Sequence, residues 1–211
     1  MPMQAEQEHQ SIRLFENDFL ERLSHVHPIT PLLMWAPISI WLFWRSVSVH
    51  NLEIWPIVAL AIAGMFIWTL SEYCLHRYLF HFPATSKFGK WLVFLFHGNH
   101  HDDPMDKTRL VMPPAGAIPI MAGLYFLFGL FIPSPWIEPF CAGFVVAYLI
   151  YDYIHYSVHH FPMKNPVAKY LKHYHLKHHF SGQGGRYGVS SPLWDRILGS
   201  DPDRSRAGTR A

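Results

Sequence analysis

Four apolar stretches, separated by polar segments, determine the predicted fold of the chain. Each is close to the roughly 17–25 residues that a helix needs to cross a membrane. The connections within the first pair and within the second pair are short, which predicts two antiparallel helical hairpins. The expected fold is all-α and integral to a membrane, with four transmembrane helices over residues 29–47, 52–70, 115–132 and 140–156.

The polar segments after the second and fourth stretches predict a helical cap on one side of the bundle. This cap would be built from residues 71–114 and 157–200. The apolar run at 90–96 is too short to span a membrane, and we expect it to begin an interfacial helix that delivers His97 to the cap. Residues 29–200 are therefore predicted to form a single membrane domain.

The two ends of the chain differ in pattern. Residues 1–28 are polar and lack the apolar core of a secretory signal, so we expect a cytoplasmic or interfacial segment. Residues 201–211 are polar and are predicted to be a disordered tail. An amphipathic helix in the first segment would place on one side Ile12, Phe15, Phe19 and Leu20.

Composition supports a membrane protein and excludes several other classes. Charged residues make up 15% of the 211 positions and hydrophobic residues 50%, whereas an ordinary soluble domain carries about 25% charged residues. A net charge of +2 is too small to indicate a nucleic-acid partner. Cys74 and Cys141 lie in apolar runs, which predicts small buried residues rather than a disulfide scaffold.

Basic residues are concentrated after the second and fourth apolar stretches. Five lie between positions 77 and 109 and nine follow residue 156, whereas the loops within the hairpins have almost none. Because Lys and Arg accumulate on the cytoplasmic side of membrane proteins, both termini and the cap are predicted to be cytoplasmic. The expected location is a multi-pass protein of a bacterial inner membrane or the endoplasmic reticulum.

Ten of the sixteen histidines form four short clusters. Residues three and four apart share one face of an α-helix, as metal ligands must. The two histidines of the first cluster, His76 and His81, are five residues apart, which places them about 140° from each other around a regular helix. They can share a site only where the helix ends, tightens or bulges. The clusters are His76 and His81; His97, His100 and His101; His155 and His159; and His175, His178 and His179.

Ten imidazoles exceed the roughly four to six ligands that one metal ion takes. Two ions, each with about five nitrogen ligands and an open position, account for the number. Imidazole suits iron, copper, zinc and nickel, but two open positions at a membrane surface favour oxygen activation over zinc hydrolysis. The remaining histidines are isolated, except His160 and His173, for which supporting and purely structural roles both stay open.

Carboxylates recur beside the clusters. Metal-bound histidines usually donate their second ring N–H to such a group, which fixes the orientation of the ring. Each carboxylate could equally be a solvated acid or a helix cap. The candidates for the supporting role are Glu72, Asp102, Asp152 and Asp195.

These segments resemble the fatty acid hydroxylase superfamily of histidine-rich, integral-membrane di-metal oxygenases, and within it the fatty acid 2-hydroxylases. The PMDKTRLVMPP run is the most specific feature, because HxxHH motifs alone also occur in sterol oxidases, desaturases and carotenoid hydroxylases. The resemblance covers about residues 70–200. It is carried by EYCLHRYLFH (72–81), HGNHHDDPMDKTRLVMPP (97–114), YDYIHYSVHH (151–160), YLKHYHLKHHF (170–180) and YGVSSPLWD (187–195).

The resemblance implies that all ten clustered histidines bind two iron ions beneath the cap. It further implies O2-dependent hydroxylation of a fatty acyl chain, free or of the sphingolipid type, at the carbon next to its carbonyl. Zinc could occupy the same ligands in an isolated protein but cannot change redox state. Many relatives have a fused cytochrome b5 domain with an HPGG haem motif. This chain has no such motif, so we expect a separate cytochrome b5-like or ferredoxin-like electron donor.

Alternative functions stay open at this point. A sterol or carotenoid hydroxylase or desaturase of the same superfamily would share the histidine motifs. A metal transporter, a membrane metal sensor or a structural zinc protein would use histidines without catalysis. Transporters place their ligands near the bilayer midplane, whereas these clusters are predicted at the cytoplasmic ends of helices.

Overall fold

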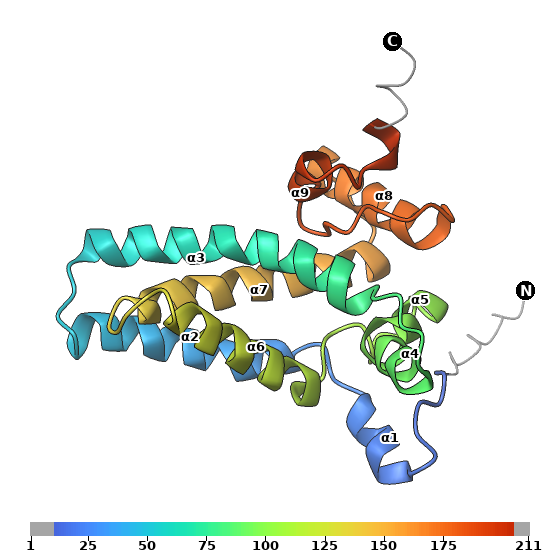
Figure 1. Ribbon diagram of the computed structural model, residues 1–211, viewed down its shortest axis with the longest axis horizontal. Helices are drawn as coiled ribbons and strands as arrows, with labels where there is room; N and C mark the ends of the chain where they lie inside the picture. The colour runs from blue at the N-terminus through green and yellow to red at the C-terminus, as the bar shows by residue number, and fades with distance from the viewer. Residues whose placement is uncertain (1–10, 205–211) are drawn as a thin grey trace, which may run out of the picture.

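The computed structural model describes residues 11–204, which are helical with no β-strand in that range, so the all-α prediction is confirmed. Four long helices lie side by side, and the short helices gather at one end of this bundle (Figure 1). The long helices are α2 (Thr30–Ser48), α3 (Ile54–Cys74), α6 (Pro114–Gly129) and α7 (Ile137–His160). The short helices are α1 (Asp18–Ser24), α4 (Lys87–Val93), α5 (Asn99–Asp102), α8 (Pro166–Phe180) and α9 (Leu193–Ile197).

The four long helices occupy the four predicted apolar stretches to within a few residues. Two helical segments, residues 54–80 and 137–160, are long and apolar enough to cross a membrane, and α6 is apolar but shorter. Helix α3 leaves large apolar side chains exposed, among them Trp55, Ile62 and Phe66. An apolar face of this kind is what a lipid environment would cover.

Helix α7 is the centre of the bundle and packs against both α2 and α3. Helices α3 and α7 approach closely, because glycines allow their backbones to touch. A Cβ at Gly64 would lie 2.0 Å from the carbonyl oxygen of Phe140, and a Cβ at Gly143 would lie 2.1 Å from that of Ala61. Small residues therefore determine how close these two helices come.

A buried ion pair joins α2 to α7 at the end of the bundle away from the short helices. The Arg45 guanidinium donates to Glu138 with an Nη2–Oε1 distance of 2.8 Å, and His50 Nε2 lies 3.0 Å from the same oxygen. The Glu138 side chain is only 8% exposed. Because a buried carboxylate must be paired, this cluster fixes the register of α2 against α7.

Two π-helical segments interrupt the regular helices that carry histidines. Residues Leu75–Phe80 continue α3 as a π-helix, and Phe94–Gly98 form a second one between α4 and α5. The His81 amide donates a hydrogen bond to the His76 carbonyl at 3.1 Å. A hydrogen bond between residues five apart is the bond that defines a π-helix. The irregularity predicted from the spacing of these two histidines is therefore confirmed.

The two described ends of the chain differ in how they compare with the predictions. Helix α1 begins only at Asp18, and residues 1–10 of the expected N-terminal segment lie outside the described residues. Disorder over 201–204 was a wrong prediction, because Asp201 is buried and Asp203 pairs with Arg186 at 2.9 Å. Residues 205–211, the rest of the predicted tail, lie outside the described range.

Candidate metal centre and substrate cavity

The ten clustered histidines come together as two groups of five. Within each group one nitrogen of every ring lies within 4.8 Å of all the others. Such a group can hold a metal ion, and the numbers agree with the predicted two sets of about five ligands. The first group is His76, His81, His97, His101 and His178, and the second group is His100, His155, His159, His175 and His179.

Each HxxHH motif serves both groups. His97 and His101, four residues apart, belong to the first group, whereas His100 between them belongs to the second. In α8 the assignment is reversed, because His178 belongs to the first group, whereas His175 and His179 belong to the second. The sequence placed the three rings of each motif on one helical face but did not reveal this division.

Backbone carbonyls fix the ring state of two histidines in the first group. His76 Nδ1 lies 2.5 Å from the Tyr187 carbonyl oxygen, and His178 Nδ1 lies 2.8 Å from that of Gly185. A carbonyl oxygen only accepts hydrogen bonds, so each Nδ1 must carry the proton. In a neutral ring the Nε2 of both residues then directs a lone pair at the centre of the group.

The distances between ring nitrogens fit a shared metal ion. Neighbouring Nε2 atoms within the groups are 2.8–3.1 Å apart. Two nitrogens at about 2.1 Å from one ion, with about 90° between them, are separated by about 3.0 Å. Converging lone pairs at this spacing repel each other unless a cation lies between them, so the donor set fits a metal ion in each group.

Burial keeps these imidazoles neutral. Burial, followed by the charge of His178, lowers the pKa of His81 to about 4. Burial, followed by neighbouring histidines, lowers the pKa of His101 to about 3 and holds that of His100 well below its usual value. A metal binds only the unprotonated ring, so the ligand form predominates near neutral pH.

Two of the predicted carboxylates support the first group through the backbone rather than by direct contact. Glu72 accepts hydrogen bonds from the amides of Val189 at 2.6 Å and Ser190 at 2.9 Å. Asp195 accepts from the amides of Tyr187 at 2.9 Å and Gly188 at 2.7 Å. The His76 ring was expected to bind a carboxylate, but it binds the Tyr187 carbonyl instead. The hydrogen bonds to Glu72 and Asp195 hold residues 187–190, and with them this carbonyl, in place.

The other predicted supporting residues lie in different settings. Asp102 is exposed, whereas Asp152 is buried and its Oδ2 has no hydrogen-bond partner among residues 11–204. His160 belongs to neither group and lies against Tyr156, with ring centroids 4.6 Å apart and the planes tilted by 48°. His173 is exposed on α8 and also lies outside both groups.

The loop at residues 181–188, which carries the two carbonyls that bind His76 and His178, was not predicted from the sequence. Arg186 is 1% exposed and has a φ of +60°. Gly185 has a φ of +110°, and a Cβ there would lie 2.2 Å from the Ser200 carbonyl oxygen, so only glycine fits. The SGQGGR run was the available signal, since consecutive glycines beside a metal-ligand motif indicate a backbone that must approach closely.

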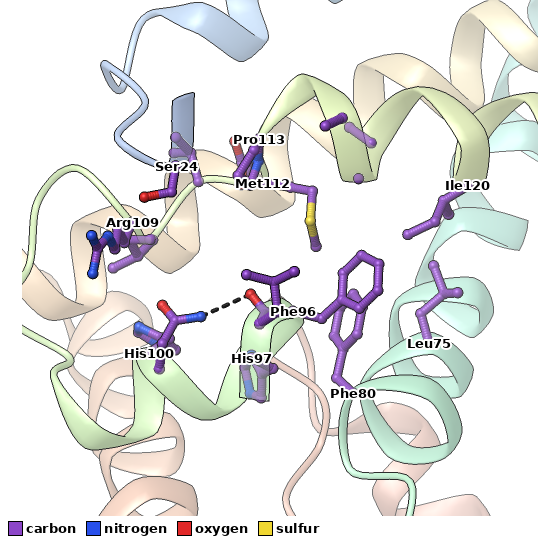
Figure 2. A pocket seen from close by; sticks show the side chains of 18 of the residues that line it. Ser24, Leu75, Phe80, Phe96, His97, His100, Arg109, Met112, Pro113 and Ile120 are labelled. Carbon is purple, nitrogen blue, oxygen red and sulfur yellow. Dashed lines mark hydrogen bonds between the residues drawn. The ribbon is translucent and has the colours of Figure 1, made fainter. Parts of the chain in front are cut away.

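An apolar cavity of about 280 Å³ touches both histidine groups. His97 of the first group and His100 and His155 of the second group line it. Figure 2 shows His97 and His100 on one side and Met112 and Pro113 across from them. The remaining lining is mostly aliphatic and aromatic, and it includes Leu75, Phe80, Phe96, Ile120 and Met121.

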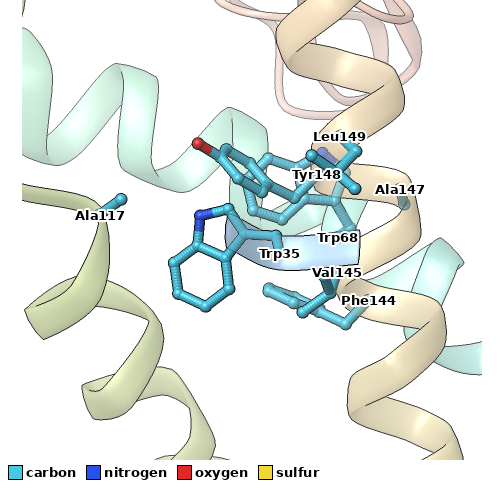
Figure 3. Packing of buried hydrophobic residues seen from close by; sticks show 8 residues of the cluster. All are labelled: Trp35, Trp68, Ala117, Phe144, Val145, Ala147, Tyr148 and Leu149. Carbon is cyan, nitrogen blue, oxygen red and sulfur yellow. The ribbon is translucent and has the colours of Figure 1, made fainter. Parts of the chain in front are cut away.

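The cavity rests on the aromatic core of the bundle. Trp68 and Tyr148 line the cavity and also belong to the core cluster drawn in Figure 3. The Trp68 ring makes edge contacts with Phe144 and Tyr148, with centroid separations of 5.1 Å in both cases. Interlocked rings of this kind leave few alternative packings, so the floor of the cavity is rigid.

Helix α1 closes one side of the cavity and is held there by the DKTRL segment of the sequence. Leu20 and Leu23 of α1 line the cavity. Arg109, which is buried, donates to Glu21 and lies 2.9 Å from His25 Nε2. The Val26 amide also donates to the carbonyl that precedes Arg109, at 2.7 Å. The segment singled out in the sequence therefore anchors the wall of the cavity.

The fold and the site together define a class: a helical protein with membrane-length apolar helices and two five-histidine sites that can each hold a metal ion beside an apolar cavity. The profile of the family described as "Fatty acid hydroxylase" matches residues 61–200. The chain therefore belongs to the fatty acid hydroxylase family, as its motifs predicted.

Relatives of known activity support the same assignment. The chain is 39% identical to dihydroceramide fatty acyl 2-hydroxylase FAH1 of Arabidopsis thaliana, over 90% of this chain and 80% of that protein. It is 34% identical to the fatty acid 2-hydroxylase of Rattus norvegicus, over 87% of this chain and 55% of the relative. A solved structure of full-length scs7p, with only its hydroxylase domain visible, is 36% identical and superposes with a TM-score of 0.82, over 88% of this chain and 70% of that one.

Proposed function

We propose that this protein hydroxylates a fatty acyl chain at the carbon next to its carbonyl, and that residues 29–200 form the single domain that does so. The ten clustered histidines would hold two iron ions. When bound, these supply the activation of O2, with one oxygen atom inserted into the C–H bond and the other reduced to water by two external electrons and two protons. The acyl substrate would be free or of the sphingolipid type.

The observation that carries this proposal is the contact of one apolar cavity with both histidine groups. An acyl chain in this cavity would gain about 0.8 kcal/mol for each buried methylene. The rigid aromatic floor would exclude water and hold the chain against His97 and His100. Asp152, one turn before His155, lines the same cavity and offers an unpaired carboxyl oxygen for a proton or a polar group of the substrate.

The proposed setting is a membrane crossed by α2, α3, α6 and α7, with the short helices and both termini on the cytoplasmic side. Two of these helical segments meet the length and composition expected of a membrane span. The concentration of Lys and Arg in the two segments between and after the hairpins supports the orientation. The reacting chain could then enter from the bilayer while its polar end stays at the surface.

We further propose that electrons come from a separate protein of the cytochrome b5 or ferredoxin type. Residues 161–180 contain four lysines and no Asp or Glu. This segment includes α8, which carries His175, His178 and His179. A basic surface next to the ligands suits an acidic electron-transfer partner, because complementary charge accelerates encounter.

Lipid mass spectrometry of cells that express the chain tests the function. Cells with the parent protein should accumulate acyl chains that have gained one oxygen next to the carbonyl. The variants His100→Ala and His178→Ala should abolish this product, whereas His173→Ala, an exposed histidine of the same helix α8, should retain it. Oxidised sterols or carotenoids in place of hydroxylated acyl chains would overturn the acyl assignment in favour of the related enzyme class.

A further inference from the structure

The cavity has two chemically different ends. Arg109 and Ser24 lie at one end, and Leu75, Phe96 and Ile120 lie at the other, with the histidines between them along one side (Figure 2). An acyl group has a polar carbonyl and an apolar tail. If its reacting carbon lies at the histidines, the carbonyl points to the Arg109 end and the tail points to the apolar end.

Gly116 leaves room for Phe96, at the apolar end, and for Met112, which lies across from His97 (Figure 2). A Cβ at Gly116, in the first turn of α6, would lie 2.9 Å from Met112 Sδ and 3.1 Å from Phe96 Cε1. All three residues line the cavity. The absence of a side chain at position 116 therefore allows Met112 and Phe96 to lie back against α6 and leaves the space in front of them to the substrate.

Phe96 is also tied to the metal-ligand region. Its ring stacks near Phe80 with centroids 6.3 Å apart and planes 17° apart, and Phe80 in turn stacks on His97 at 5.5 Å. Phe80 is buried. The position of the Phe96 ring is thus fixed relative to the ligand His97, so the distance from the reacting position to this wall is set by the fold.

We infer that Gly116, Met112 and Phe96 form a wall that limits the length of the acyl tail. This inference rests on the proposed function, because it assumes that the cavity holds an acyl chain. A larger side chain at position 116 pushes Met112 and Phe96 into the cavity and shortens it. Removal of the Phe96 ring lengthens it, while Phe80 remains on His97.

The test compares Gly116→Leu with Gly123→Leu, a matched substitution on the same helix where an added Cβ meets no atom within 4 Å. Binding is measured without turnover, as the thermal stabilisation of the purified full-length protein by saturated fatty acids of increasing length. Gly116→Leu should shift the preferred acid to a shorter one, with about a tenfold loss of affinity for the longest acid that the parent binds. Gly123→Leu should keep the parental preference.

A substitution that enlarges the cavity should shift the length preference in the opposite direction. Phe96→Ala should extend binding to longer acids, whereas Phe126→Ala, an exposed phenylalanine of α6, should change nothing. Should Gly116→Leu fail to fold, Gly116→Ala should move the preference in the same direction by a smaller amount.

Identical length preferences in the parent, the position-116 variants and Phe96→Ala would overturn the wall, as would a parent protein that binds no fatty acid. A length preference that shifts as expected in a protein that hydroxylates no lipid would support the wall and contradict the proposed reaction. The two ideas therefore fail in different ways.

Discussion

The contact between α3 and α7 gives a stability prediction that can be worked out from distances. A Cβ at Gly143 would lie 2.1 Å from the Ala61 carbonyl oxygen and 2.6 Å from its carbonyl carbon, whereas ordinary contact begins at 3.4 Å. Gly143→Ala must therefore push the two helices apart by about 1 Å. Both clashing atoms belong to the backbone, so no rotation of a side chain relieves them.

The expected cost is at the upper end of overpacking, about 3 kcal/mol. Replacing glycine by alanine inside a helix returns about 1 kcal/mol, which leaves a net loss of about 2 kcal/mol. For a chain of this size the melting temperature should fall by about 4–8 °C. Metal content should fall as well, because α3 leads to His76 of the first group and α7 carries His155 of the second, and metal ligands tolerate only about 0.2 Å of displacement.

Thermal unfolding and metal analysis of the detergent-purified protein measure both effects. Gly123→Ala, with no neighbour within 4 Å, is the control and should be neutral or slightly stabilising. A Gly143→Ala protein that melts at or above the temperature of the Gly123→Ala protein, with its metal content intact, would refute a backbone clash between α3 and α7.

Two further predictions concern the charges around the site. Glu21→Ala should destabilise the protein by about 3 kcal/mol in denaturant unfolding, because it removes the carboxylate that accepts from the buried Arg109 and leaves only Asp106, 3.9 Å away, as an ion-pair partner among residues 11–204. Asp18→Ala, which breaks an exposed ion pair, should cost less than about 1 kcal/mol, and equal costs would count against the buried pair. In metal-depleted protein the melting temperature should fall steadily from about pH 6.5 to about pH 4. In the folded protein the pKa values of His81 and His101 are lowered from 6.5 to about 4 and about 3. Over that pH range these two histidines therefore bind protons in the unfolded chain but not in the folded one, which favours unfolding as the pH falls. A melting temperature that does not change with pH would contradict the lowered pKa values.

Much of the fold was predictable because its signals are local. The long helices follow from uninterrupted apolar runs, and the π-turn at residues 75–80 follows from two histidines whose spacing does not fit a regular helix. The two sets of about five ligands follow from counting imidazoles. None of these inferences requires knowledge of which distant segments meet.

The features that escaped prediction all depend on long-range contacts. Glu72 precedes His76 by one turn, which suggested a direct hydrogen bond, but its oxygens bind the amides of Val189 and Ser190 more than a hundred residues away. Likewise Arg109 was counted as a loop charge, yet it is buried against Glu21. A residue's type indicates that it needs a partner, but only the folded chain shows which partner it has.

The sharing of each HxxHH motif between the two groups makes the groups mechanically inseparable. A rotation of α8 that displaced His178 from the first group would also displace His175 and His179 from the second. A substitution that moves α8, or the helical segment that carries residues 97–101, therefore alters both sites at once. Any chemical difference between the two metal positions must instead be encoded in the elements that serve one group each. These are the π-helical end of α3 and the loop at residues 181–188 for the first group, and α7 for the second.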